Sequence, residues 1–182
     1  FFALRTSFTT LPPVRVGSME CVLFENTTDT YLEDGNILGS AAAGVLFWNC
    51  TRPRVLRLTV KQTRADGLHF ANCQDARVDY LWTEDTGDDG LAFLNYAGNP
   101  DYFGGIANNI SVKRSKARGI TVVGQRNVSV TTFTIEDTAV SGLYVAQEAS
   151  YNTRVPRDCT FTGGTITRAW QFAGQTGNRY GV

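Results

Sequence analysis

The sequence has no excess of charge and no long hydrophobic run. Its 17 basic and 17 acidic side chains balance to a net charge of zero over 182 residues, which gives no support for a polyphosphate or an anionic membrane surface as a partner. No apolar stretch approaches the roughly 18 residues of a membrane-spanning helix. We therefore expect neither nucleic acid nor a membrane among its partners.

Cysteine, histidine and methionine are also scarce. The four cysteines lack the CxxC spacing of a zinc site and are too few and too widely spaced for a disulfide scaffold. There is one histidine and one methionine, whereas Thr, Val, Gly and aromatic residues are abundant, which favours strands over helices. The composition predicts an all-β chain, and its length predicts one domain.

A short motif, in which a glycine (Cys21 in the first copy) precedes alternating apolar residues, recurs along the chain. The copies are CVLFEN at 21, GVLFWN at 44, GLHFAN at 67, GLAFLN at 90, GITVVG at 119 and GLYVAQ at 142. Successive copies are 23 residues apart except for one step of 29, so one repeat carries six extra residues. The segment from Tyr96 to Gly104, rich in turn-forming residues, supplies this loop.

Each repeat holds at least two short strands. Besides the motif, apolar residues alternate in VLRLTV at 55, VDYLWT at 78, NNISV at 108 and TTFTI at 131. Similar residues at one phase indicate that successive turns stack, each strand parallel to its copy about 4.8 Å away. The pattern predicts a right-handed parallel β-helix with about 23 residues per turn and six to seven turns. A leucine-rich repeat has a similar period but requires leucine two residues after the asparagine, where this sequence has Thr, Gln or Ala.

Asparagine recurs at the fifth position after the glycine. The copies are Asn26, Asn49, Asn72 and Asn95. Side-chain amides stacked in register can bond to each other and to the backbone of a turn, so we expect an asparagine ladder at an inward corner of the coil. Cys50 and Cys73 follow two of these residues in adjacent turns, and we expect them to be neighbours, either as buried thiols or as a disulfide.

Two columns of charge alternate in sign along the coil. One contains Lys61, Glu84, Lys113 and Glu136, and the next contains Gln62, Asp85, Arg114 and Asp137. Opposite charges on adjacent strands stabilise a sheet by about 0.2–1 kcal/mol each, and exposed pairs often by less. We interpret both columns as structural, which removes Glu84 and Asp85 from the chemical candidates.

A third group of charged residues does not alternate. Asp66 and Asp89 precede the glycine in consecutive turns, Asp88 stands beside them, and Arg118 occupies the same position one turn later. Like charges about one strand spacing apart raise the pKa of one carboxyl group, which can then act as a general acid near neutral pH. This favours a catalytic site. The alternative is a tight corner that requires Asp and Gly, with Arg118 neutralising the pair.

Strand alternation turns two further residues away from the core. His69 is either a plain exposed strand residue or a substrate contact close to the carboxylates, and Tyr144, at the same phase three turns later, could stack on the face of a sugar.

The stretches TRADG at 63 and TGDDGLAF at 86 resemble the paired Asn-Thr-Asp and Gly-Asp-Asp motifs of the polygalacturonase and rhamnogalacturonase glycoside hydrolases, within the pectate-lyase-like β-helix superfamily. The resemblance covers about 37–150. It implies an inverting hydrolase in which Asp88 is the general acid while Asp66 and Asp89 hold and activate water. Inverting hydrolysis needs two carboxyl groups about 6.5–9.5 Å apart, which side chains splayed from adjacent turns can meet.

Two motifs of that family are missing. Arg118 stands where the family has a histidine between two glycines, and Tyr144 and Ala146 stand where it has Arg-Ile-Lys. Because the missing groups contact uronate carboxylates, polygalacturonate is disfavoured, although Arg118 or Lys116 could substitute. A polysaccharide lyase or epimerase stays open, with Ca²⁺ on the three aspartates and Arg118 or Lys116 near the reacting carbon.

The sequence as a whole predicts a glycosidase that acts on a polysaccharide or oligosaccharide without a cofactor, Ca²⁺ being required only if it is a lyase. The catalytic residues would be Asp66, Asp88 and Asp89, and the groove would be lined by His69, Arg118, Lys116 and Tyr144, with the insertion as one wall. The hypothesis from a different class is a non-catalytic glycan-binding or tailspike β-helix.

Two expectations concern the chain as a whole. Since the repeat is already in phase at Cys21 and the tail reads as another irregular turn, we expect residues 1–182 to be one domain and a fragment of a longer β-helix that lacks its caps. A polysaccharide substrate implies secretion or the cell surface.

Overall fold

The computed structural model describes residues 5–7 and 11–171. The elements are β1 (Arg5–Ser7), β2 (Val22–Glu25), β3 (Tyr31–Glu33), β4 (Asn36–Ser40), β5 (Val45–Trp48), β6 (Arg54–Thr63), β7 (Leu68–Ala71), β8 (Ala76–Glu84), β9 (Leu91–Leu94), β10 (Phe103–Lys113), β11 (Ile120–Val123), β12 (Arg126–Glu136), β13 (Leu143–Ala146), the 3-10 helix η1 (Ala149–Tyr151) and β14 (Thr160–Thr167). Within the described part of the chain, no helix has the length and hydrophobicity that a membrane crossing requires.

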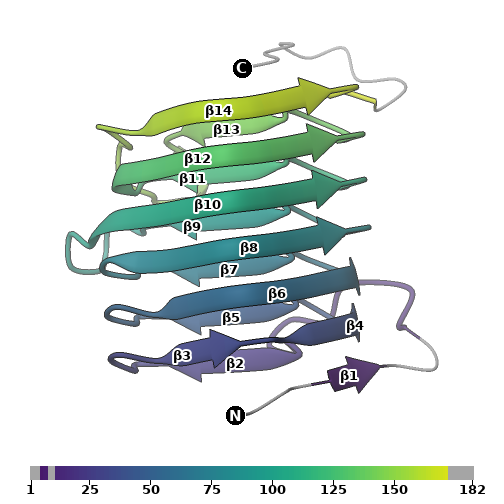
Figure 1. The fold of residues 1–182 in the computed structure, drawn as a ribbon. Coiled ribbons are helices and arrows are strands. Elements are labelled where there is room, and N and C mark those ends of the chain that lie inside the picture. The colour runs from purple at the N-terminus through teal and green to yellow at the C-terminus, as the bar shows by residue number, and fades with distance from the viewer. Residues whose placement is uncertain (1–4, 8–10, 172–182) are drawn as a thin grey trace.

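The strands form two parallel sheets, a long one and a short one. The long sheet runs β1-β4-β6-β8-β10-β12-β14, with β3 also paired to β6, and the short sheet runs β13-β11-β9-β7-β5-β2. The short strands lie behind the long ones, and each turn of the chain stacks on the turn before it (Figure 1). This is the predicted right-handed parallel β-helix.

The register follows the repeat. Val45 pairs with Leu68 and Leu68 with Leu91, each one period of 23 residues further on. Leu91 then pairs with Ile120, so the loop absorbs the longer step without a shift in register. The alternating apolar residues of the motif form columns in the core, and the clearest is a stack of phenylalanine rings with centroids 4.7, 5.2 and 5.2 Å apart. Its members are Phe24, Phe47, Phe70 and Phe93.

Asparagine turns the corner after the short strands. Asn26, Asn49 and Asn72 have φ of 53–55°, and Gly124 at the equivalent position has φ of 75°, a left-handed conformation that Gly and Asn adopt most readily. The amide of Asn72 donates to Oδ1 of Asn49 at 3.0 Å, and Asn95 donates to a carbonyl of the insertion at 2.9 Å. The ladder is confirmed at its centre, but the inward placement is wrong for Asn26, which is exposed at the end of the stack.

Cys50 and Cys73 are buried neighbours in adjacent turns, as expected. Both thiols are free, so of the two alternatives the structure has stacked thiols and not a disulfide. Burial raises the pKa of Cys73, which keeps this thiol protonated and unreactive.

The two alternating columns of charge form ion-pair ladders along the ends of the long strands, as predicted. Lys61 and Glu84 are 2.8 Å apart, and Arg114 and Asp85 are 2.7 Å apart. The pairs lie at the surface, with side chains up to 42% exposed, so each contributes little to stability.

Candidate functional site

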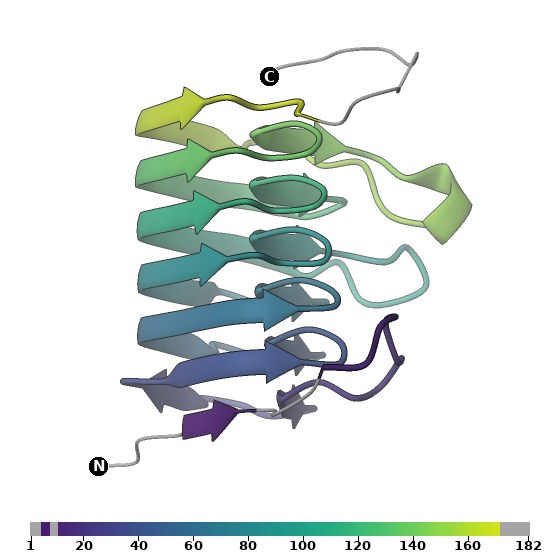
Figure 2. The same ribbon diagram turned by 90° about the vertical axis from the view of Figure 1, so that its right-hand side faces the viewer.

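A groove runs along the outer face of the short sheet. It consists of two adjoining cavities of about 570 and 200 Å³, which share Arg15, His69 and Tyr96 as lining residues. The floor is made by outward-facing residues of the short strands, among them Leu46 and Ala92. Loops that leave the coil on one side, including the insertion and the segment around η1, border it (Figure 2).

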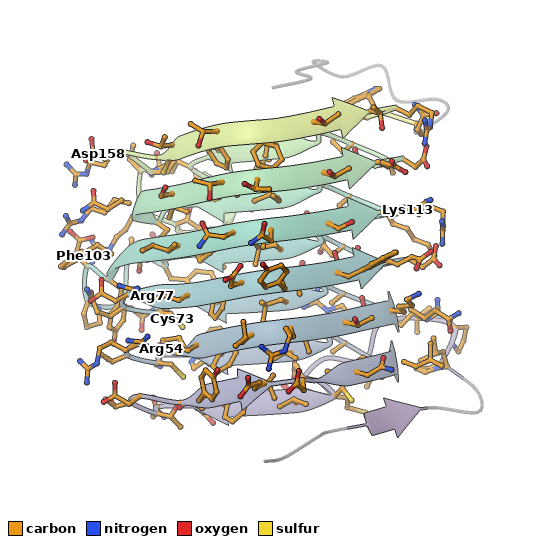
Figure 3. The ribbon with its side chains drawn as sticks, viewed as in Figure 1. Arg54, Cys73, Arg77, Phe103, Lys113 and Asp158 are labelled. Carbon is orange, nitrogen blue, oxygen red and sulfur yellow. The ribbon has the colours of Figure 1, made fainter. Side chains whose placement is uncertain are left out.

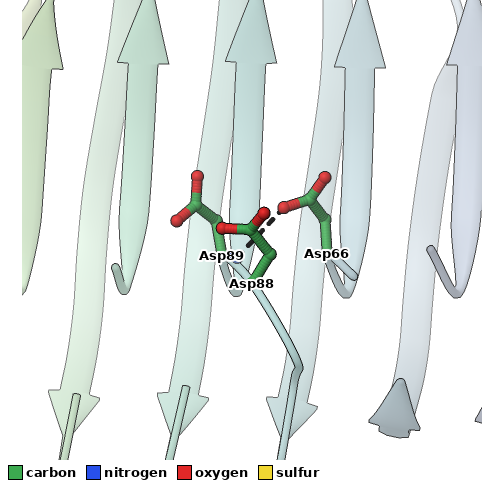
Figure 4. Close-up of side chains that lie close together, drawn as sticks. All are labelled: Asp66, Asp88 and Asp89. Atoms are coloured by element: carbon green, nitrogen blue, oxygen red, sulfur yellow. Dashed lines mark hydrogen bonds between the residues drawn. The ribbon is translucent and has the colours of Figure 1, made fainter. Parts of the chain in front are cut away.

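The structure brings the three predicted aspartates together at the edge of this groove. Asp66 and Asp89 directly precede two glycines one turn apart, and the backbone N–H of Asp89 donates to Oδ1 of Asp66 at 3.0 Å (Figure 4). One carboxylate oxygen from each of Asp66, Asp88 and Asp89 lies within 4.8 Å of the others. Three negative groups at this distance interact strongly, so they titrate as one coupled cluster.

His69 forms an ion pair with the first of these aspartates. Its Nδ1 is 2.7 Å from Oδ2 of Asp66, and the two side chains are 16% and 8% exposed. Burial opposes the charge on both residues, but their mutual attraction outweighs it, so the pKa of Asp66 is lowered and the pKa of His69 is raised. His69 is therefore not a plain exposed strand residue. Its buried Nε2 has no hydrogen-bond partner among the described residues and lines the groove.

Arg118 holds Asp89. The guanidinium Nε lies 2.9 Å from Oδ1 of Asp89, Nη2 donates to Oδ2 at 3.1 Å, and the backbone N–H of Arg118 donates to Oδ1 at 3.0 Å. Burial nevertheless raises the pKa of Asp89 to about 8, against the pull of Arg118 and with the help of Asp66 and Asp88. Arg118 also lies 4.7 Å from the ring centroid of Tyr144 and 3.6 Å from Glu148. The positive charge of Arg118 therefore has two carboxylates and one aromatic ring as neighbours.

Asp88 is the most accessible carboxylate of the cluster. Its side chain is 39% exposed and lines the smaller cavity, and Arg15 approaches it only to 3.8 Å. Burial and the neighbouring Asp66 raise its pKa. Asp88 is therefore the carboxyl group that can both hold a proton and reach a molecule in the groove.

Two of the predicted lining residues are placed differently. Lys116 is exposed and does not line either cavity, because it belongs to the turn before the strand and not to its outer face. Tyr144 is partly buried, and its ring stacks on Arg118 and does not border the cavities.

Sequence reasoning missed several groove residues on loops and on the floor. These are Arg15, Tyr151, Glu148 and Thr121. Tyr96, at the start of the predicted wall, does line the groove and pairs with Thr153 in a short antiparallel bridge. The insertion is also bonded to the loop around η1, which contains Thr153: Arg154 of that loop donates to the carbonyl of Asn99 at 2.6 Å. The length of the insertion was the only sequence signal for these contacts.

The ion pair of His69 predicts a shifted titration that one experiment can follow. Because His69 is the only histidine, its ring resonances in an NMR titration should report a pKa above the usual 6.5, and that pKa should fall in Asp66→Asn. Since the pKa of His69 is raised and that of Asp66 is lowered, the pair stabilises the fold most between about pH 4 and 6.5. It loses this effect as pH rises through the pKa of His69. A pKa at or below 6.5 in the unchanged protein would contradict the pair.

No protein-family model matches the sequence, and a search of curated proteins finds no match. Among solved structures, the catalytic domain of a GH87 alpha-1,3-glucanase in complex with nigerose matches with a TM-score of 0.65 at 18% identity, over 78% of this chain and 26% of that chain. A structure of the same catalytic domain with an Asp-to-Ala substitution, in complex with tetrasaccharides, matches with a TM-score of 0.71 at 18% identity, over 84% and 28%. The periplasmic alginate epimerase AlgG matches with a TM-score of 0.59 at 9% identity, over 79% and 42%.

These likenesses show the fold: a right-handed parallel β-helix, which the chain shares with carbohydrate-active enzymes that include hydrolases and epimerases. The chain spans about a quarter of the length of the glucanase structures that it matches.

Proposed function

We propose that this β-helix hydrolyses glycosidic bonds of a neutral polysaccharide bound along the groove, with Asp88 as the general acid. The observation that carries the proposal is the split within the aspartate cluster. Asp66 is held ionised by His69, whereas Asp88 has a raised pKa and faces the cavity. Glycoside hydrolysis requires two carboxyl groups beside the glycosidic bond, one protonated and the other ionised.

The reaction would proceed as follows. Asp88 gives its proton to the glycosidic oxygen as the bond from that oxygen to the anomeric carbon breaks. The oxygen of a water molecule bonds to the anomeric carbon, and Asp66 accepts the proton that the water loses. Asp89, fixed by Arg118, holds this water. The closest approaches within the cluster, up to 4.8 Å, are shorter than the roughly 6.5–9.5 Å between carboxyl groups of inverting enzymes, so an inverting reaction requires Asp88 to rotate outward.

The charges of the groove favour a neutral substrate over a polyuronate. The three basic groups that line the smaller cavity all lie beside carboxylates: His69 beside Asp66, Arg118 beside Asp89, and Arg15 closest to Asp88. A uronate carboxylate would have to compete with these partners and would approach an aspartate cluster of its own sign. The structurally similar glucanases hold nigerose and tetrasaccharides, which supports an oligosaccharide ligand here.

A panel of polysaccharides tests the proposal. Neutral glucans, mannans and xylans should release reducing ends, while polygalacturonate and alginate should not, and the anomer of the first product, followed by NMR, gives the stereochemistry. Unsaturated products from a uronate polymer that absorb in the ultraviolet would instead make the protein a lyase. Binding without any bond cleavage would make it a glycan-binding β-helix.

Removing divalent cations is expected to leave turnover unchanged. The three aspartates are close enough to share a cation, and a lyase or epimerase with Asp-bound Ca²⁺ would use them in this way. In this cluster, however, His69 and Arg118 already supply positive charge at 2.7 and 2.9 Å from Asp66 and Asp89. Initial rates in EDTA and in added calcium chloride check this, and loss of activity in EDTA that calcium restores would favour the calcium mechanism.

A further inference from the structure

Two aromatic side chains stand out from the long sheet, on the opposite side of the coil from the groove. Tyr80 is 57% exposed and Trp82 is 47% exposed, and both belong to β8. They border a hollow of about 310 Å³ that is also lined by polar residues of the strands on either side, Thr59 of β6 and Ser111 of β10. Figure 3 turns this face of the sheet toward the viewer, with Arg54 and Arg77 at one end of the strands and Lys113 at the other.

The register explains why these rings protrude. Trp82 pairs with Thr59 on one side and Ser111 on the other, both of them small, so the indole rises above its neighbours. Tyr80 has φ of 56°, and this left-handed bend in the strand leaves the phenol pointing outward. Tyr80 and Trp82 both line the hollow, so one ligand can contact both rings.

The charged groups around the hollow are already paired within the protein. Arg57 bonds both carboxylate oxygens of Asp34, at 2.6 and 3.0 Å. Lys61, which lies 5.3 Å from the ring centroid of Trp82, is 2.8 Å from Glu84. An ionic ligand would have to break one of these pairs, so charge complementarity favours a neutral occupant.

Unused hydrogen-bonding groups remain beside the rings. The structure gives no hydrogen bond from any described residue to the hydroxyls of Thr59, Ser111 and Tyr80, whereas the amide of Asn109 is used by Asp79 at 2.8 Å. A ligand that fits has apolar faces for the rings, hydroxyl groups for the rim and no charge. A neutral sugar has all three properties.

We propose that this hollow is a second carbohydrate-binding site, separate from the groove, which holds a neutral glycan against Trp82 and Tyr80. Such a site would keep a polymer attached to the protein while the groove binds another part of the same polymer. This raises the effective concentration of the polymer at the groove. The site binds sugar whether or not the groove is catalytic.

The test follows the indole N–H resonance of Trp82 by NMR during titration with a glucose tetrasaccharide. The titration uses Asp88→Asn as the background so that the ligand is not consumed, and Trp82→Ala assigns the resonance among the three tryptophans. We expect a saturable shift of the Trp82 signal, and a dissociation constant for this site about tenfold higher in Tyr80→Ala, since one aromatic contact is lost. Trp82→Ala in the otherwise unchanged protein should hydrolyse a soluble tetrasaccharide at the original rate but bind insoluble polysaccharide less.

Tyr31→Ala is the matched control, because Tyr31 is 54% exposed on the same face but lies outside the hollow. It should leave the dissociation constant unchanged. The proposal is overturned if neither a neutral tetrasaccharide nor a tetramer of galacturonate shifts the Trp82 signal. It is also overturned if the galacturonate tetramer shifts the signal as strongly as the neutral one. Light scattering that shows Trp82→Ala dissociating an oligomer would make the face a contact between copies, which also overturns it. If the protein shows no turnover but the Trp82 signal still shifts with sugar, the proposed function of the groove is wrong and the second binding site stands.

Discussion

Asp88→Asn should lower kcat by about 10²–10⁴-fold, the range that a positioned general acid supplies, without lowering the thermal stability of the protein. Asparagine has the shape of aspartate but no proton to give to the leaving oxygen. The pKa of Asp88 is raised by burial and by Asp66, so its ionised form is unfavourable in the folded state. Asparagine cannot ionise and does not carry this penalty, so the midpoint of thermal unfolding should stay constant or rise slightly.

The size of the defect should depend on the leaving group. A sugar alcohol needs protonation to leave, whereas a nitrophenolate hardly does, so Asp88→Asn should impair hydrolysis of a nitrophenyl glycoside much less than hydrolysis of the polysaccharide. Equal losses on both substrates would point to a role other than acid catalysis. A fall in stability that matches the fall in rate would make Asp88 a structural residue.

Asp85→Asn is the matched control for this experiment. Asp85 is an aspartate of nearly equal exposure, 41% against 39%, but it belongs to the ion-pair ladder and lies 2.7 Å from Arg114. It should keep full turnover and lose at most about 1 kcal/mol of stability, as exposed pairs do. An activity loss in Asp85→Asn as large as in Asp88→Asn would contradict the division between ladder and site.

The aspartate cluster could be predicted from the sequence because a coil converts spacing into distance. Residues one period apart, such as Asp66 and Asp89, have to stack, and the same rule correctly placed Glu84 and Asp85 in ladders with basic partners. The partner of His69 was open for a different reason. Alternation fixes the face on which a side chain lies, but not its rotamer. The sequence therefore left His69 as either an exposed strand residue or a substrate contact close to the carboxylates, and its ion pair with Asp66 was not predicted.

The walls of the groove could not be predicted in this way. Arg15 comes from the segment before the first regular turn, and Glu148 and Tyr151 come from a loop that follows the last short strand. Such segments have no copy one period away, so nothing in the repeat fixes their position. Lys116 was placed in the groove because it is in phase with the coil. It belongs to a turn, however, and a turn residue need not face the groove.

The shape of the long strands was also only partly visible in the sequence. The alternating segments were found, but β6, β8, β10 and β12 each continue through a left-handed residue at one shared phase of the repeat. These residues are Arg57, Tyr80, Asn109 and Thr132, with φ of 53–57°. Of these four residue types only asparagine is typical of that conformation, so the bend left no pattern to detect. The same bend directs Tyr80 outward at the proposed second site.

Gly67→Ala should cost about 3 kcal/mol of the free energy of unfolding, at the upper end of what overpacking usually costs. A Cβ at Gly67 would lie 2.5 Å from Cγ2 of Thr83 and 2.6 Å from the carbonyl oxygen of Gly90. The oxygen belongs to the backbone of the next turn, which is fixed by the hydrogen bond from Leu68 N to that oxygen at 3.1 Å. No positive φ is required here, so lack of space accounts for the glycine that marks every copy of the repeat except the first, which has Cys21.

Urea denaturation of Gly67→Ala measures this loss, and Gly98→Ala is the control, since a Cβ at Gly98 would meet nothing within 4 Å. Gly67 directly follows Asp66, so a turn displaced by the new methyl group would also move the carboxylate that His69 holds ionised. We therefore expect turnover to fall as well, with the pKa of His69 moving toward 6.5. Unchanged stability with altered turnover would mean that the turns can separate locally, and the spacing of the aspartates would then depend on the loops more than on the coil.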